Sequence, residues 1–221
     1  MLRTLLRPAA ASGVLAFGTG RYHRCEQQNS PESDSQQEFL RVWFDGMKPG
    51  YDARWFDRDS EWFRSFIASR TVWEDLWEAT SAAPPPVDSD AFTTLEAVLV
   101  LDQVPRSLFP ASPRAFASDD RALKVAREAL EQGKDMELPY SQRVWMYMPL
   151  LHSERLADQE TCVRAMEEIA ARFPAAEPFH QAAVEHHRAV AKFGRLPERN
   201  RVLGRPSTAE ELHWLRAHPT A

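Results

Sequence analysis

The sequence predicts an all-α protein, and three observations support this fold class. Apolar residues recur at helical spacing, as in Phe39, Val42 and Trp43. Strand signals are scarce, because no alternating run of Val, Ile and Thr is bounded by Asn-Gly or Asp-Gly turns. The connections between the periodic segments are short, which favours antiparallel neighbours. We therefore expect an antiparallel array of about eight helices, in a single domain over residues 38–221.

The first predicted helices end at residues that cannot continue a helix. One begins near Glu38. The next is capped by Ser60 or Asp59 and carries an apolar stripe as far as Trp77. The prolines at 84–86 stop it, because a proline has no backbone N–H to donate to the preceding turn.

The remaining helices are placed by the same signals. Ser89 or Asp90 opens a third helix, which we expect to stop near Pro105. Ser118 caps a fourth, which ends at Gly133. Apolar periodicity places the others at 141–147, 157–172, 178–193 and 207–217.

Composition and charge narrow the class of function. The chain has 221 residues, of which 43% are hydrophobic and 27% charged, and its net charge is −5. An acidic chain argues against a general nucleic-acid binder. No apolar run reaches the roughly 18 residues that span a bilayer. Two cysteines, Cys25 and Cys162, are too few for a disulfide framework, and no glycine-rich loop or other motif calls for a cofactor.

The first 25 residues differ from the rest of the chain. No acidic residue precedes Glu26, and the segment contains Arg3, Arg7, Arg21 and Arg24. This pattern is typical of a mitochondrial transit peptide. A secretory signal and an untargeted tail on a cytoplasmic protein are the alternatives. The polar stretch 26–37 has the composition of a linker, so we expect 1–37 to be a targeting segment and linker.

Two stretches at the ends of predicted helices hold polar residues in apolar surroundings. Asp102 and Arg106 are four residues apart and can share a helix face, either in a site or as a salt bridge that fixes the helix end. His152 is a candidate general base that Glu154 orients. The alternative is a buried histidine before a helix N-cap at Ser153. Ser153 lacks the Gly-x-Ser-x-Gly surroundings of a nucleophile.

Two further stretches lie near the C-terminus. His180 and His187 share a helix face, but without further ligands they indicate an ordinary helix surface rather than a metal site. A loop with Gly194 and Pro197 then carries Arg195, Arg199, Arg201 and Arg205. These arginines can clamp an anion, or they can hold acidic side chains and helix ends within the fold.

Several of these motifs, in this order, make the chain resemble domain-of-unknown-function family 924 over about residues 38–217. They are the segments 101–106, 116–119, 148–154 with Gln159, and 193–205. The resemblance implies a tetratricopeptide-like all-α fold and no known activity. It places on the family's polar positions Asp102, Gln103, Arg106, His152, Ser153, Glu154, Gln159, Arg195, Arg199 and Asn200.

The family pattern also includes a histidine before Phe-Gly-Arg, and the spacing favours His186 over His187. Two positions depart from it. Ser107 replaces the usual asparagine, and Glu198 replaces the usual histidine. If that histidine transfers protons in relatives, this chain has lost or altered the step.

Two classes of function follow. In the first, an inter-helix pocket binds an anionic small molecule, His152 and Glu154 form the acid/base pair, and the ligand contacts are Asp102, Gln103, Arg106, Ser153, Gln159, His186, Arg195, Arg199 and Asn200. In the second, the helices are a scaffold for a protein or peptide partner, with exposed tryptophans as anchors. A third interpretation is that the motifs only hold the fold.

Overall fold

The computed structural model describes residues 31–44, 46 and 51–218, and these residues form helices and no strand, which confirms the predicted fold class. The α-helices are α1 (Pro31–Phe44), α2 (Glu61–Ala68), α3 (Arg70–Ala82), α4 (Ala91–Leu108), α5 (Asp119–Glu131), α6 (Tyr140–Met146), α7 (Met148–Leu151), α8 (Leu156–Arg172), α9 (Glu177–Phe193) and α10 (Ala209–Ala217). Short 3-10 helices connect them: η1 (Ala53–Trp55), η2 (Pro113–Phe116), η3 (Lys134–Glu137), η4 (Pro174–Ala176) and η5 (Pro197–Arg199).

The targeting segment expected over 1–25 lies outside the described residues, and its role stays a prediction. Helix α1 begins at Pro31, inside the stretch 26–37 whose composition is that of a linker. Within the described part of the chain, no helix is both long and apolar enough to cross a membrane.

Capping residues set several helix starts, and two of them, Ser60 and Asp90, are among the caps that the sequence predicts. Ser60, Asp90 and Thr208 each accept a hydrogen bond from a backbone N–H in the first turn of the helix that follows. The segment expected as one helix from Ser60 to Trp77 differs, because the chain breaks at Ser69 into α2 and α3.

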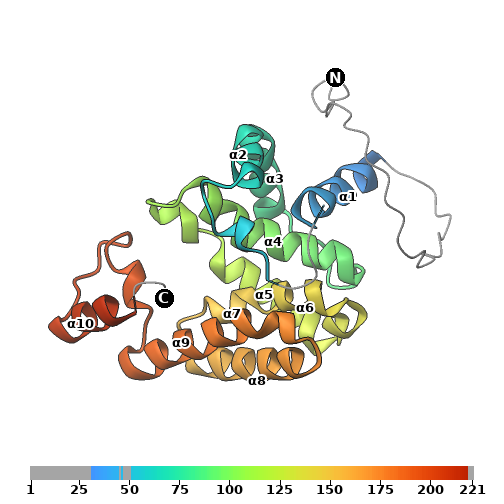
Figure 1. Ribbon diagram of the computed structural model, residues 1–221. Helices are drawn as coiled ribbons and strands as arrows, with labels where there is room; N and C mark the ends of the chain where they lie inside the picture. Colours follow the sequence, from blue (N-terminus) through green and yellow to red (C-terminus); the bar gives the residue numbers. More distant parts are fainter. Residues whose placement is uncertain (1–30, 45, 47–50, 219–221) are drawn as a thin grey trace.

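Helix α4 is the central element of the fold. Nearly all its residues from Leu95 to Leu108 are buried, and it packs against α1, α3, α5, α6 and α7. Figure 1 shows α2 and α3 on one side of α4 and α5 to α7 on the other, with α8 and α9 side by side beyond them. Helix α10 lies at one end of the molecule, far from α1 (Figure 1).

The tryptophans mainly build the core. Of the seven in the sequence, five are buried, namely Trp43, Trp55, Trp73, Trp77 and Trp145. Trp62 and Trp214 are half-buried. Trp43 packs edge-on against Trp145 and is stacked with Trp55, so aromatic contacts join α1 to α6.

Pro105 does not end α4, so the predicted stop is wrong. The helix continues to Leu108. Because Pro105 has no N–H, the carbonyl oxygen of Leu101 loses its donor from the next turn. The hydroxyl of Ser118 donates to this oxygen at 2.5 Å and accepts a hydrogen bond from the indole N–H of Trp77 at 2.8 Å. Ser118 stands at the N-cap position of α5, as predicted, but its side chain repairs α4 instead of capping α5.

We predict that Ser118→Ala lowers the free energy of unfolding by about 1–3 kcal/mol, because two buried polar groups then lack a partner. Denaturant unfolding measures the change. Ser65→Ala, at an exposed position of α2, is the control and should change stability by less than about 0.5 kcal/mol. A cost for Ser118→Ala no larger than that of the control would contradict this explanation of the unbroken helix.

Candidate functional site

A buried carboxylate, Asp102 of α4, organises the candidate site. Its side chain has 0% exposed surface. His152, which follows α7, places Nδ1 2.8 and 2.9 Å from the two carboxylate oxygens. Gln103 Nε2 donates to the same carboxylate at 2.6 Å, and Arg106 Nη1 lies 3.1 Å from it. Three predicted site residues therefore meet at Asp102. Gln103 and Arg106 lie on α4 itself, and His152 lies more than forty residues later in the chain.

The charges around Asp102 determine the protonation of His152. Burial alone would raise the pKa of Asp102, but Arg106 and His152 outweigh it and hold the pKa well below its usual range. Asp102 is therefore a carboxylate that only accepts, so Nδ1 of His152 donates. Burial, together with the charge of Arg106, lowers the pKa of His152. The imidazole is thus neutral at pH 7, and its Nε2 keeps a free lone pair.

Asp119 and Arg199 extend this arrangement toward α5 and η5. Asp119 lies 2.9 Å from Nη1 of Arg106 and accepts a hydrogen bond from Nη1 of Arg199 at 3.0 Å. Both guanidinium groups lie over the ring of Phe116, at 5.6 and 4.8 Å from its centroid. Burial raises the pKa of Asp119 and lowers that of Arg199. We call the group formed by Asp102, Gln103, Arg106, Asp119, His152, His186 and Arg199 the Asp102 cluster.

His186 of α9 stands beside His152. The centroids of the two rings are 6.3 Å apart. Nδ1 of His186 lies 2.9 Å from the carbonyl oxygen of Ala182, which only accepts, so Nδ1 donates and Nε2 is free. Burial lowers the pKa of His186, and nearby Glu198 partly offsets this. One carboxylate oxygen of Glu198 is buried without a hydrogen-bond partner among the described residues.

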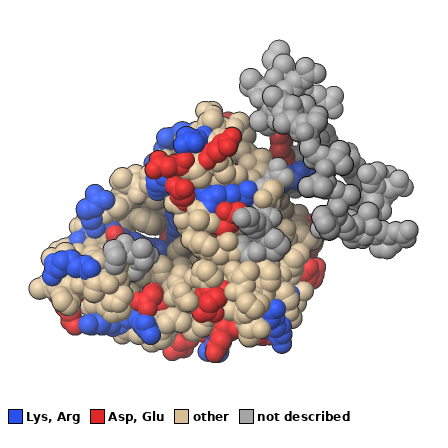
Figure 2. All heavy atoms as spheres, in the orientation of Figure 1, with Lys and Arg blue, Asp and Glu red and all other residues tan. Residues whose placement is uncertain are grey.

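The Asp102 cluster is partly open to solvent. The side chains of His152 and Arg106 are 16% and 18% exposed. Figure 2 shows a hollow in the surface between the C-terminal part that carries α10 and the segment that links α4 to α5.

Glu154 does not orient His152. Its carboxylate accepts hydrogen bonds from Nη1 and Nη2 of Arg205 at 2.8 and 2.9 Å, and from the backbone N–H of Leu196 at 2.9 Å. Burial would raise the pKa of Glu154, but the hydrogen bonds from Arg205 lower it. The partner of His152 is Asp102, 50 residues away in the chain.

Arg195 and Asn200 serve the C-terminal segment. Arg195 donates two hydrogen bonds to Glu211, at 2.6 and 2.8 Å. Asn200 donates to Ser207 Oγ at 3.1 Å and accepts from Nε of Arg205 at 2.9 Å. Among the arginines of this loop, Arg195 and Arg205 therefore make internal clamps, and Arg199 belongs to the Asp102 cluster.

Ser153 and Gln159 fix the turn between α7 and α8. The hydroxyl of Ser153 donates to Asp158 at 2.6 Å. The amide of Gln159 donates to the carbonyl oxygens of Leu151 and Ser153, at 2.6 and 2.7 Å. These bonds hold His152, which lies inside the turn, in place.

Sequence reasoning left Asp119 out of the candidate site. An acidic residue in the first turn of a helix is usually explained by the helix dipole, and Asp119 occupies that position in α5. The signal that could have found Asp119 was its place in the segment 116–119, one of the segments that carry the family resemblance.

The comparisons with known proteins support the fold and name no activity. The family model for a bacterial protein of unknown function, DUF924, matches residues 39–218, so the chain belongs to this family. Among solved structures, the chain is similar to a protein of unknown function from Agrobacterium tumefaciens. The two are 27% identical with a TM-score of 0.71, over 84% of this chain and 98% of that one. No curated protein matches the chain.

We predict that His152 and His186 together lower the free energy of unfolding as the pH falls from about 7 to about 5. The pKa values of His152 and His186 are lowered in the folded state, so below about pH 6.5 the unfolded chain binds protons that the folded chain does not. Each histidine contributes a slope of up to about 1.4 kcal/mol per pH unit. Denaturant unfolding across this range measures this loss together with the opposite contributions of Glu96 and Asp119, whose pKa values are raised in the folded state.

His152→Gln should reduce this slope by one histidine's share. His213→Gln, at an exposed position of α10, is the control and should leave the slope unchanged. If His152→Gln has no more effect on the slope than the control, then His152 is not held neutral in the folded state.

Proposed function

We propose that the Asp102 cluster binds a small anionic molecule and that His152 acts on this molecule as a general base. The observation that carries the proposal is a neutral imidazole, oriented by a buried carboxylate and placed beside two guanidinium groups. This combination of an oriented base with cationic groups is what proton abstraction from an anionic substrate requires.

Arg199 has the donors that an anion needs. A guanidinium group carries five N–H donors, and Arg199 directs only Nη1 to a described side chain, that of Asp119. The remaining N–H groups suit a carboxylate or phosphate, which a guanidinium binds through two parallel hydrogen bonds. Arg199 is 9% exposed, so a bound anion would be largely shielded from water.

Nε2 of His152 is the atom that takes the proton. Its ring partner Nδ1 is bound to Asp102, and Asp102 also stabilises the imidazolium that forms on protonation. With the site empty, burial and the positive charges of Arg106 and Arg199 keep the pKa of His152 low. An anion bound to these arginines offsets their charge and raises that pKa. The base therefore becomes stronger when the substrate is present.

The scaffold function has less support. It relies on exposed tryptophans in a groove, whereas five of the seven tryptophans are buried in the core. Trp214 stacks on His218, with ring centroids 3.9 Å apart, so it is also engaged within the fold.

A thermal-shift experiment on the full chain tests the proposal, with inorganic phosphate and succinate as probes at constant ionic strength. A ligand that binds only the folded state stabilises it by about 2.7 kcal/mol at a hundredfold excess over its Kd. We expect at least one probe to raise the Tm. Arg199→Gln should abolish this shift, and Arg201→Gln, an exposed position of the same loop, should retain it.

Two results would contradict anion binding at the cluster. Loss of the shift in both variants would indicate general charge attraction instead of a site. The absence of any shift, in a chain that Arg199→Gln destabilises, would indicate that the cluster only holds the fold.

A further inference from the structure

A second buried carboxyl group, Glu96, lies on α4 closer to its N-terminus than Asp102. Glu96 is 5% exposed, and it has no side-chain hydrogen bond or ion pair with any described residue. It lines a cavity of about 100 Å³, which Thr80 of α3 and Pro85 of the following loop also border. The oxygens of Glu96 are not among the buried side-chain atoms without a partner in the described part of the chain, so a molecule in the cavity can reach them.

The polar atoms that face this cavity are suited to accept hydrogen bonds. The hydroxyl of Thr93 donates its hydrogen to Asp90 at 2.6 Å, so the oxygen of Thr93 keeps its lone pairs for a donor. An ionised Glu96 only accepts. No Lys, Arg or His is among the described residues that line the cavity, and apart from Thr80 the rest of its wall is apolar, including Leu76 and Pro85. A carboxylate on Glu96, with no cationic side chain among the described lining residues, suits a cation with a short apolar part and disfavours an anion.

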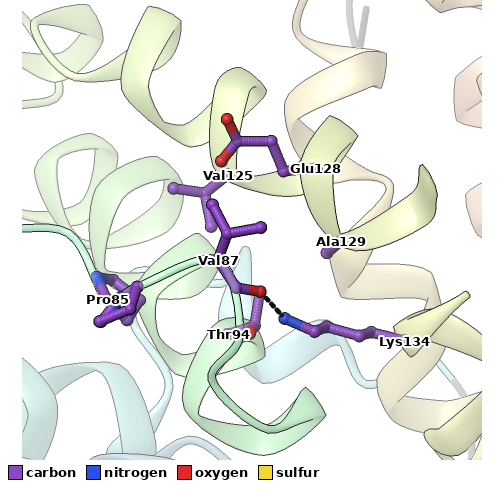
Figure 3. A pocket seen from close by; sticks show the side chains of 8 residues that line it. Pro85, Val87, Thr94, Val125, Glu128, Ala129 and Lys134 are labelled. Atoms are coloured by element: carbon purple, nitrogen blue, oxygen red, sulfur yellow. Dashed lines mark hydrogen bonds between the residues drawn. The ribbon is translucent and has the colours of Figure 1, made fainter. Parts of the chain in front are cut away.

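The neighbouring pocket, across the same loop, already holds an ammonium group of the chain. Lys134 of η3 is buried there, and its Nζ donates to the carbonyl oxygen of Val87 (Figure 3). Pro85 borders both pockets. The pocket on one side of the loop thus contains the ammonium group of Lys134. The cavity on the other side, which Glu96 lines, has no cationic side chain among its described lining residues.

We infer that the Glu96 cavity binds a small primary ammonium ion, an R–NH3⁺ group on a short alkyl chain. The N–H donors of the ammonium would meet the Glu96 carboxylate and the oxygen of Thr93, and its alkyl chain would contact Leu76 and Pro85. The cavity is smaller than the roughly 150 Å³ that holds a benzene molecule, so three or four heavy atoms fit. A metal ion needs more ligands, and the described residues contain no group of three or more His, Cys, Asp or Glu that could bind one.

Binding at this site is linked to a proton. Burial raises the pKa of Glu96 to about 8, and Asp90 of the same helix start adds to the effect. The described residues that α3 and the loop contribute, which include Leu76, Thr80 and Pro85, carry no titratable group. In the empty site Glu96 is therefore protonated at pH 7, and a bound cation displaces the proton. The affinity should rise roughly tenfold per pH unit from pH 6 to pH 8 and level off above.

Calorimetric titration of the full chain with propylammonium chloride at pH 6, 7 and 8 tests the inference. We expect saturable binding with this pH dependence and release of close to one proton at pH 6, seen as a heat that varies with the ionisation enthalpy of the buffer. Propanol lacks the charge, and tetramethylammonium lacks N–H donors. Both should bind at least tenfold more weakly.

Glu96→Gln keeps the shape of the side chain and removes its charge, so it should abolish binding. Glu128→Gln, in the Lys134 pocket, is the matched control and should leave the affinity unchanged. If Glu96→Gln does not fold, the pH dependence of propylammonium affinity in the unmodified protein decides whether the inference holds. No binding of propylammonium, an affinity independent of pH, or equal binding of propanol would each overturn the inference. The site lies apart from the Asp102 cluster, so these results do not depend on the proposed function.

Discussion

The carboxylate of Asp102 is the constraint on which the rest of the candidate site depends. A buried charge is costly unless it is paired and hydrogen-bonded, so α4 can hold Asp102 only with its donors in place. Gln103 and Arg106 donate from α4 itself, and His152 donates from the turn after α7. The need to satisfy one carboxylate therefore fixes how this turn sits against α4, and it fixes the imidazole in one orientation.

The same constraint extends to the C-terminal segment. Arg106 pairs with Asp119 at the start of α5, and Asp119 pairs with Arg199 of η5. Arg199 can reach this position because its surroundings are tethered elsewhere, by Arg205 to Glu154 and by Arg195 to Glu211. The internal clamps and the candidate site are thus parts of one arrangement. The clamps set the position of the loop, and the loop delivers one guanidinium group to the Asp102 cluster.

The features that the sequence predicts well depend on short-range physics. The apolar periodicity and the caps at Ser60 and Asp90 need only a few neighbouring residues, and the structure confirms them. Pro105 was mispredicted because the group that repairs the helix, Ser118, lies in the next helix and is invisible to a local rule. In the same way, a local rule selects Glu154 as the partner of His152, because the two residues are only two positions apart in the sequence.

In the folded chain Asp102 lies closer to His152 than Glu154 does. Only the packing of α4 against α7 brings Asp102 and His152 together. The family resemblance placed Asp102 and His152 in one pattern without indicating that they touch. Glu96 gave no signal at all, because a lone acidic residue in an apolar helix shows neither its burial nor the cavity beside it.

The central claim is that Asp102 holds His152 as a neutral imidazole, with the proton on Nδ1 and a free Nε2. Nitrogen NMR of the His152 ring at pH 7, in the unmodified protein and in Asp102→Asn, tests it most directly. We expect one protonated and one unprotonated ring nitrogen in the unmodified protein, and loss of this single tautomer in Asp102→Asn, with His213 unchanged. A doubly protonated His152 at pH 7, or a tautomer that survives Asp102→Asn, would contradict the claim.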